Sequence, residues 1–341
     1  MSDFSWPDTL ARLLRGEDLP EHEAAAAMGE IMSGSATPGQ IGGFLLALRA
    51  KGETVDEIVG FAKMMRSFSN KVSAAGPLVD TCGTGGDRAG TVNVSTMAAL
   101  AVAGAGARVA KHGNRAQSSD CGSADLLEAL GVVIDLGPEG VAACIDEAGI
   151  GFCFAPVFHP AMKHAGPVRR ELGVPTTFNF LGPLTNPAGV SRQTVGVSDA
   201  VMAPKMADAL AQLGAEHAFV FRGDDGLDEL TTTTTSRLWE IRDGVTERAF
   251  DPAEAGIGRV AAADLRGGSA EDNAKIALRL LDGEEGAVRD VVALNAACAL
   301  VASGIAPDIG EGFARAGEAI SSGRAKQALE RFREVSQKLK P

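Results

Sequence analysis

Long apolar runs are missing from this chain of 341 residues. No stretch approaches the roughly 20 consecutive apolar residues that a membrane-spanning helix needs, so we expect no membrane-inserted segment. The opening residues, MSDFSWPDTLARLL, lack the basic start, apolar centre and small-residue cleavage site of a secretory signal peptide. Tyrosine is also absent, and we have no physical account of that absence.

Cysteine is scarce, with five residues and no C-x-x-C pair. An odd number of cysteines without paired spacing gives no disulfide framework. Reduced thiols in the cytoplasm are therefore the simplest interpretation. No base is evident beside Cys82, so we interpret this residue as a small buried filler and not as a nucleophile.

Positive charge is in deficit, because 32 Lys and Arg face 44 Asp and Glu and leave a net charge of −12. This balance argues against general binding to nucleic acid or to anionic membranes. It leaves room for an anionic substrate, since a few Arg and Lys can reverse the field inside one pocket. The length of the chain and its ordinary apolar and charged content predict a globular protein of two domains.

Residues 1–73 carry helical patterns with no strand pattern between them. Thr37-Pro38-Gly39-Gln40 has the form of a capping box with proline at the first helical position. Thr54 and Glu57 repeat this device, and apolar residues at helical spacing follow both boxes. These segments predict a small helical domain, and part of residues 159–190 is expected to join it.

After Gly76 the pattern changes to strands that alternate with helices. Residues 78–81 and 107–111 read as buried strands on either side of a helix over 95–103, which implies a parallel sheet with right-handed crossovers. Further strands are predicted at 132–135, 151–154, 193–197 and 218–222, and Asp243-Gly244 predicts a hairpin within 237–250. The predicted fold class is α/β, with a mostly parallel central sheet flanked by helices over residues 74–341.

A glycine-rich loop, Gly83-Thr84-Gly85-Gly86-Asp87, directly follows the first predicted strand. Glycines let the backbone approach a ligand closely and turn N–H groups toward an anion. The N-terminus of the following helix also favours phosphate. A plain tight turn is the alternative, because the loop matches neither the Rossmann nor the Walker A pattern.

The segment Lys111-His112-Gly113-Asn114-Arg115 ends the next strand of the same unit. Because the carboxyl ends of adjacent parallel strands share one crevice, its two cations predict an anionic ligand there, and a solvated charged loop is the alternative. Ser118, Ser119 and Ser123 add hydroxyl groups nearby. For Ser123, the N-cap of a helix is a better explanation than a ligand contact.

Several long motifs in register resemble those of anthranilate phosphoribosyltransferases. They are DTCGTGGD, KHGNR, GSADLLEALGV, HPAMKHAGPVRRELGVPTTFNFLGPLTNP and GLDEL, in this order. RGEDL and ATPGQIGGFLLALRAKGETVDEI also resemble the helical domain of that family. The resemblance runs from about Leu13 to the C-terminal helices, including Leu294-Asn295-Ala296-Ala297, and it implies the family's fold and activity.

The resemblance implies a site for phosphoribosyl pyrophosphate (PRPP) and Mg²⁺. The implied PRPP contacts are Gly83, Thr84, Gly85, Gly86, Asp87, Thr91, Asn93, Ser95, Thr96, Lys111 and Ser123. The Ser95 hydroxyl and the adjacent carboxylates of Asp228 and Glu229 are the implied Mg²⁺ ligands, and hard oxygen donors suit this ion. Without the resemblance, an exposed acidic turn would be the better interpretation of Asp228 and Glu229.

The second implied substrate is anthranilate, an aromatic ring that carries an amine and a carboxylate. The implied anthranilate residues are Gly83, His112, Asn114, Arg169, Gly182 and Pro183. Arg169 is implied to engage the carboxylate, and an arginine fork fits that group. His159 and His164 lie five residues apart, off the spacing of helical metal ligands, so we interpret them as packing or channel residues.

The implied reaction needs no single catalytic acid or base, because the anthranilate amine is a neutral nucleophile. Alignment of the reactants and charge stabilisation on departing pyrophosphate are expected instead. A homodimer formed through helical-domain faces such as Phe44 and Phe61 is also expected. The rival interpretations are a pyrimidine nucleoside phosphorylase-like enzyme and a non-catalytic, nucleic-acid-binding relative of the fold, which would be expected to have a basic surface.

Overall fold

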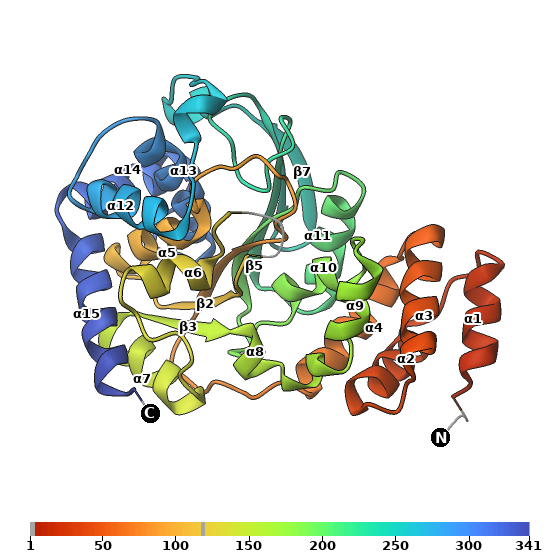
Figure 1. Ribbon diagram of the computed structural model, residues 1–341. Coiled ribbons are helices and arrows are strands. Elements are labelled where there is room, and N and C mark those ends of the chain that lie inside the picture. The colour runs from red at the N-terminus through yellow and green to blue at the C-terminus, as the bar shows by residue number, and fades with distance from the viewer. Residues whose placement is uncertain (1–3, 117–119, 341) are drawn as a thin grey trace.

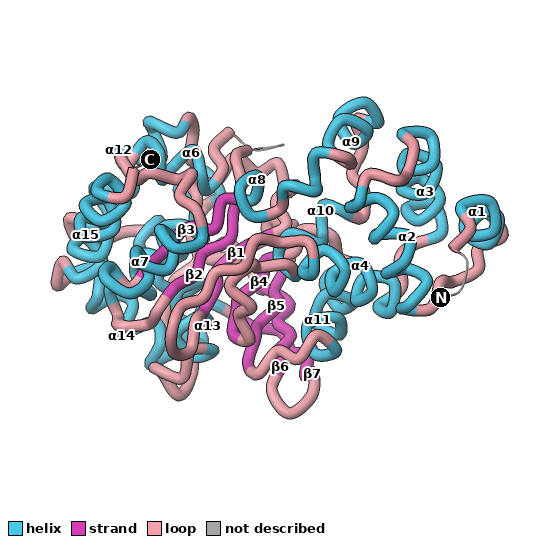
Figure 2. Tube along the Cα trace, turned by 90° about the horizontal axis from the view of Figure 1, so that it is seen from below, coloured by secondary structure: helices cyan, strands magenta, loops and turns pink. Residues whose placement is uncertain are grey.

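The computed structural model describes residues 4–116 and 120–340. Helices α1–α4 lie at one end of the molecule and α12–α15 at the other, with a sheet between them (Figure 1). The same arrangement is visible from below in Figure 2. Among the helices of these two ranges, none combines the length and the apolar character needed to cross a membrane.

Two of the N-terminal helices begin at the capping boxes that the sequence predicts. The bounds of the N-terminal helices are α1 Trp6–Leu14, α2 Glu21–Ser33, α3 Pro38–Lys51 and α4 Val55–Ser67. Both predicted capping boxes are present, with Thr37 and Gln40 at the start of α3 and Thr54 and Glu57 at the start of α4. Capping satisfies N–H groups that the first helical turn leaves free.

Phe44 and Phe61 lie inside the helical domain and not on its surface. Both side chains are fully buried, and their rings pack edge to face with centroids 5.8 Å apart. The expectation that they form a dimer face is therefore wrong. Helical spacing marks the apolar face of a helix, and here that face packs against neighbouring helices of the same domain.

A later segment of the chain packs against these helices. It consists of α8 Ala155–Phe158, η1 Pro160–Lys163, α9 Gly166–Leu172, α10 Phe178–Leu181 and η2 Gly182–Leu184. Short helix η1 contacts α2, α9 contacts α3, and α10 contacts α4. Val168 and Phe178 lie in the same apolar cluster as Phe44.

Seven strands form one sheet in the order β3-β2-β1-β4-β5-β6-β7. Their bounds are β1 Val79–Gly83, β2 Val109–Gly113, β3 Ile150–Phe154, β4 Arg192–Gly196, β5 His217–Gly223, β6 Ser236–Ile241 and β7 Val245–Phe250. The first five strands in this order are parallel, and the β6–β7 hairpin extends the sheet antiparallel to β5. Asp243 and Gly244 form its turn, and both have positive φ.

Helices cover both faces of the sheet. Their bounds are α5 Val94–Gly104, α6 Ser123–Ala129, α7 Pro138–Ala148, α11 Met202–Gln212, α12 Ala270–Leu281, α13 Ala287–Ala302, α14 Ile309–Ser321 and α15 Arg324–Lys338, with short turns η3 Pro252–Ala255 and η4 Ala262–Leu265. Along β5, Phe219 and Phe221 belong to the apolar cluster that contains α5 and α13, whereas Ala218 and Val220 belong to the one that contains α11. This alternation is the period of a strand buried on both faces.

The strand predicted at residues 132–135 does not form. Val132, Ile134 and Leu136 alternate as buried residues, but the Val133 N–H donates to the Ser336 hydroxyl on α15, 3.1 Å away. The segment packs in an extended conformation against a helix and pairs with no strand in the described ranges. Alternation reports which residues are buried and does not identify the partner.

Candidate active site at the carboxyl ends of β1 and β4

The order in which the chain adds strands to the sheet reverses between β1 and β4. From β1 the chain moves to β2 and β3 on one side, and later to β4 and β5 on the other. The loops that follow β1 and β4 therefore diverge and leave a crevice at their carboxyl ends. Gly83, which ends β1, pairs with Gly196, which ends β4.

These two glycines allow the loop after β5 to approach the sheet. A Cβ atom at Gly196 would lie 1.5 Å from the carbonyl oxygen of Asp228, and one at Gly83 would lie 2.4 Å from its carboxylate. No side chain fits at such distances. The pair of glycines thus brings Asp228 over the ends of β1 and β4.

The predicted glycine-rich loop lies at the same place. Gly85 and Gly86 have φ values of 65° and 89°, a region that glycine enters at little cost. The Gly85 N–H donates to the Asp228 carboxylate at 2.6 Å, and the Ser198 hydroxyl donates to the Gly85 carbonyl at 2.8 Å. Thr84 accepts a hydrogen bond from the Ser198 N–H. The Asp228 side chain thus accepts a hydrogen bond from one N–H group of the loop.

Acidic groups crowd this crevice. Burial raises the pKa of Asp228 to about 7, and the neighbouring Asp87 adds to the rise. Burial and the Asp228 charge also raise the pKa of Glu229 well above its ordinary value, while Lys111 acts in the opposite direction. The carboxylates are therefore only partly neutralised by the protein, and a cation at this position would be stabilised. The interpretation as an exposed turn is wrong for Asp228 and Glu229, which are half-buried.

Lys111 extends from β2 into the same region. Its side chain is 1% exposed, and Nζ donates to the Thr81 carbonyl at 2.5 Å and to the Ser95 hydroxyl at 3.4 Å. Burial lowers the pKa of Lys111, whereas the charges of Asp80 and Glu229 raise it. A buried cation thus links the β1 strand end, Ser95 and the acidic loop.

The start of α5 adds hydrogen-bond donors. Asn93 is its N-cap, and its side chain accepts from the Thr96 N–H at 3.2 Å and donates to the Cys121 carbonyl at 3.2 Å. The Asn93 side chain is thus engaged within the protein. The Thr96 hydroxyl is buried without a hydrogen-bond partner among the described residues. Thr91 pairs with Arg266 in an isolated bridge just before this helix.

His112 closes the opposite wall of the crevice. Its Nδ1 lies 3.0 Å from the Gly182 carbonyl, an acceptor, so Nδ1 carries the proton and Nε2 is left as a buried acceptor without a described partner. Burial lowers the pKa of His112 to about 3 and that of His159 to about 4. The His159 ring packs 5.1 Å from the His112 ring, which agrees with its predicted packing role.

Asp80 and Asn186 hold this wall in place. The buried Asp80 carboxylate accepts from the His112 N–H at 3.0 Å and from Asn186 Nδ2 at 2.8 Å. Pro183 is buried next to Gly182, and its carbonyl accepts from Gln193 of β4. The 182–186 segment is therefore attached to both halves of the parallel sheet.

Arg169 on α9 is a partly buried cation. Its guanidinium stacks on the Phe178 ring at 5.3 Å, burial lowers its pKa, and no described carboxylate lies within ion-pair distance. A desolvated, unpaired arginine is a ready partner for a carboxylate. The His164 ring packs against Gly34. It belongs to no described group of side chains that could hold a metal ion.

Two expectations about the KHGNR region need correction. Arg115 is not free for a ligand, because it pairs with Asp125 at 3.0 Å and Glu128 at 2.8 Å. Ser123 is not the N-cap of α6; Gly122 is, and the Ser123 hydroxyl donates to the Asn114 carbonyl at 3.3 Å. The Asn114 side chain is exposed at this loop. Ser118 and Ser119 lie outside the described residues.

The sequence predicted no role for Asn295 and Asn273, two buried asparagines that hydrogen-bond to loops of the site. Asn295 on α13 accepts from the Leu230 N–H and donates to the Leu230 carbonyl, both at 2.9 Å, next to Glu229. Asn273 on α12 accepts from the Asn93 N–H at 2.8 Å. Each is buried and distant in sequence from the loop it supports, so no local pattern reveals its partner.

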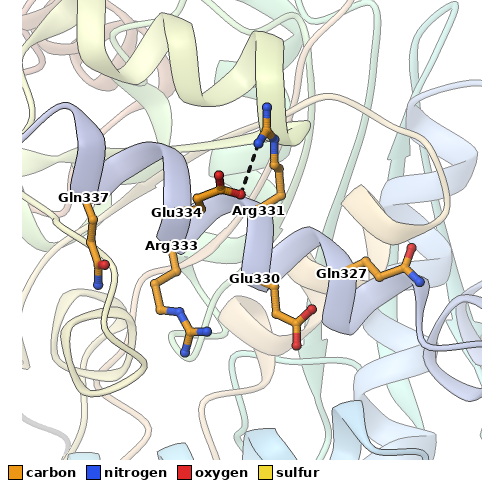
Figure 3. A pocket seen from close by; sticks show the side chains of 6 residues that line it. All are labelled: Gln327, Glu330, Arg331, Arg333, Glu334 and Gln337. Carbon is orange, nitrogen blue, oxygen red and sulfur yellow. Dashed lines mark hydrogen bonds and ion pairs between the residues drawn. The ribbon is translucent and has the colours of Figure 1, made fainter.

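No described group of three or more His, Cys, Asp or Glu side chains has the geometry to hold a metal ion by itself. A separate hollow lies on α15, lined by Gln327, Glu330, Arg331, Arg333, Glu334 and Gln337 (Figure 3). There Arg331 pairs with Glu334 and with Glu147. Charges that neutralise each other on an exposed helix leave no evident ligand site.

Comparison with known proteins identifies the family of the chain. Residues 75–326 match the glycosyl transferase family, a/b domain, and residues 7–69 match the glycosyl transferase family, helical bundle domain. Anthranilate phosphoribosyltransferase from Salinispora arenicola is 54% identical over 100% of this chain and 99% of its own length.

Solved structures give the same result for the fold. The anthranilate phosphoribosyltransferase of Thermus thermophilus has a TM-score of 0.92, 45% identity and coverage of 97% of this chain and 99% of its own. The enzyme from Saccharomyces cerevisiae, solved in complex with PRPP and Mg, has a TM-score of 0.91, 28% identity and coverage of 99% of both chains. The chain therefore belongs to the anthranilate phosphoribosyltransferase family.

Proposed function

We propose that this chain transfers the 5-phosphoribosyl group of PRPP to the amine of anthranilate and releases pyrophosphate. This is the second step from chorismate in tryptophan biosynthesis. The observation that carries the proposal is the meeting of three features at one crevice. They are the glycine-rich loop after β1, the acidic pair Asp228 and Glu229, and the end of β2 that carries Lys111 and His112.

PRPP is assigned to the side of the crevice formed by the glycine-rich loop. Backbone N–H groups of residues 83–87 and the N-terminus of α5 supply donors to its phosphates. Lys111 and the Thr96 hydroxyl add side-chain donors, and the hydroxyl has no described partner of its own. Asn93 keeps α5 capped, and Thr91 and Ser123 flank the same loops.

Mg²⁺ fits the oxygen donors at this site. Asp228 and Glu229 are adjacent carboxylates with raised pKa values, and the Ser95 hydroxyl lies beside Lys111. Two carboxylates and a hydroxyl suit an ion that usually binds few protein groups together with substrate phosphates. When bound, Mg²⁺ would neutralise the negative charge that collects on the departing pyrophosphate.

Anthranilate is assigned to the opposite wall. Arg169 faces its carboxylate, because the guanidinium is partly desolvated and has no described ion-pair partner. His112, Gly182 and Pro183 line the path of the ring, with Asn114 and Gly83 at its ends. The neutral Nε2 of His112 can accept a hydrogen bond from the amine without adding a positive charge.

The reaction then depends on alignment of the two substrates and on electrostatic stabilisation of the leaving group more than on proton transfer. The amine attacks the anomeric carbon while the carbon–oxygen bond to pyrophosphate breaks, and the surplus amine proton leaves to solvent or a phosphate oxygen. Fixing both reactants in one crevice removes most of the entropic barrier. Lys111 and the loop N–H groups stabilise the charge on the leaving group.

The test follows pyrophosphate release from PRPP and Mg²⁺ with alternative acceptors. With anthranilate we expect pyrophosphate release together with a change in acceptor fluorescence, and EDTA should abolish both. Thymidine with inorganic phosphate tests the nucleoside phosphorylase alternative, and a gel-retardation assay tests nucleic-acid binding. Nucleoside phosphorolysis, or nucleic-acid binding without turnover, would refute the proposed function.

The domain arrangement and the cellular setting remain part of the proposal. We assign residues 1–73, joined by part of 159–190, to a helical domain that carries the anthranilate side, and 74–341 to the PRPP-binding domain. A homodimer formed through the helical domain, a cytoplasmic location and the lack of nucleic-acid and membrane partners complete it. The net charge of −12 supports the lack of nucleic-acid and anionic-membrane partners.

A further inference from the structure

A buried carboxylate joins the helical domain to the walls of the crevice. Glu53 lies between α3 and α4, and its side chain is fully buried. Its two carboxylate oxygens have different partners: Oε1 accepts from the Thr177 hydroxyl at 2.6 Å, and Oε2 accepts from Arg49 at 3.0 Å. Lys205 of α11 donates to the Glu53 carbonyl at 2.6 Å. One residue therefore contacts α3, α11 and the start of α10.

The Thr177 contact leads to the anthranilate wall. Thr177 is the N-cap residue of α10 and is 1% exposed. The next residue, Phe178, provides the ring on which the Arg169 guanidinium stacks at 5.3 Å. Because Arg169 has no described ion-pair partner, the Phe178 ring is the contact that fixes its guanidinium plane. A shift of Thr177 would therefore move the ring on which the Arg169 guanidinium stacks.

The Arg49 contact leads to the PRPP side. Arg49 lies 3.7 Å from the Asp199 carboxylate, which accepts hydrogen bonds from N–H groups at the start of α11. The preceding residue, Ser198, donates to the Gly85 carbonyl of the glycine-rich loop. Glu53 is thus two non-covalent contacts away from Arg169 and three away from the glycine-rich loop.

We propose that Glu53, through its hydrogen bond to the Thr177 hydroxyl, is a positioning residue that orients Arg169 toward the anthranilate carboxylate. Glu53 touches neither substrate. Its charge is matched by Arg49, and a charge-assisted hydrogen bond to a buried hydroxyl is short and directional. The inference rests on the proposed function, because it assigns anthranilate to Arg169.

The neighbouring threonine provides a matched control. Thr176 is as buried as Thr177, but its hydroxyl has no described hydrogen-bond partner. Thr177→Val and Thr176→Val therefore make the same chemical change at adjacent buried positions. Only the first removes a contact with Glu53. Thr177→Ser keeps that hydroxyl and should restore the wild-type behaviour.

The experiment measures steady-state KM for each substrate and kcat in the wild type and the three variants. For Thr177→Val we expect the anthranilate KM to rise about fivefold, with the PRPP KM changed by less than about twofold. Thr176→Val and Thr177→Ser should match the wild type. Equal anthranilate KM values for the two valine variants would overturn the inference, and so would equal changes in both KM values for Thr177→Val.

A double-mutant cycle tests the partner. If Glu53 acts through Thr177, then Glu53→Gln and Thr177→Val should raise the anthranilate KM by less together than the product of their single effects. Independent, multiplicative effects would contradict the assignment. Lack of turnover in the wild type would instead refute the proposed function and leave the hydrogen-bond network untouched.

Discussion

Two glycines at the crevice matter because they have no side chain. Gly196 and Gly83 allow the backbone and carboxylate of Asp228 to lie against the strand ends. The sequence identified the glycine-rich loop as special because three glycines follow a strand. It could not identify Gly196, because a single glycine at a strand end has no pattern, and its neighbour comes from a loop after β5.

Gly196→Ala should damage the site more than an ordinary glycine substitution. The new Cβ would overlap the Asp228 carbonyl, which lies 1.5 Å away, so the acidic loop must move. We expect a loss of stability above roughly 2 kcal/mol and a raised PRPP KM. Thermal unfolding and kinetics measure both quantities. Gly39→Ala, at a helical position where a Cβ meets no atom within 4 Å, is the control and should leave the PRPP KM unchanged.

The buried histidines should remain neutral through the physiological pH range. Their pKa values are lowered by burial to about 3 for His112 and about 4 for His159, below the unfolded value of about 6.5. The folded protein then binds fewer protons, so this contribution to stability is complete above about pH 6.5 and is lost as pH falls toward 4. NMR titration of the imidazole resonances should show no transition for either residue between about pH 5.5 and 8. A midpoint near 6.5 for His112 would contradict the buried, neutral assignment.

At the scale of elements, the sequence determined most of the fold because the signals are local. Capping boxes mark the starts of α3 and α4, and Asp243-Gly244 marks the β6–β7 turn. The false strand at 132–135 has the burial pattern of a strand, but its partner is α15. Likewise, Arg115 was expected to bind a ligand. Its actual partners, Asp125 and Glu128, lie on a helix, and no local sequence pattern gives the orientation of that helix.

Helix α13 supports the acidic loop through Asn295, which bonds to both backbone groups of Leu230. Asn295→Ala leaves these buried groups without partners and should cost about 2–4 kcal/mol of stability. It should also raise the Mg²⁺ concentration needed for half-maximal turnover, because Glu229 loses its fixed neighbour. Cys298→Ala, a buried change on the same helix, should lower stability while leaving the Mg²⁺ dependence intact. A shared Mg²⁺ dependence would contradict this role of Asn295.

At the scale of the whole molecule, the two walls of the crevice come from different parts of the chain. The glycine-rich loop and the acidic pair follow strands of the sheet, whereas Arg169 lies on α9, which packs against α3 of the N-terminal helices (Figure 1). The sequence could place each motif on its element. Their convergence follows from the strand order, which only the folded chain reveals.

The proposed dimer predicts a solution mass of twice 35.0 kDa. Since Phe44 and Phe61 are buried, the contact must use other residues. Leu14 on α1 and Leu46 on α3 are 79% and 45% exposed, and they are the most exposed large apolar side chains of helices α1–α4. Light scattering should report the dimer mass for the wild type and a smaller mass for Leu14→Glu combined with Leu46→Glu. A monomeric wild type would refute the proposed dimer.

The central claim is that this crevice works by alignment and charge stabilisation, with no indispensable acid or base. Single-turnover kinetics of His112→Gln, at saturating PRPP, Mg²⁺ and anthranilate, test it most directly, because the proposal assigns the amine to the buried acceptor Nε2 of His112. The account predicts a rate constant reduced by no more than about 10²-fold, the lower range for loss of one proton-transfer group. Complete loss of turnover, with both substrates shown to bind, would contradict the account and make His112 a catalytic base.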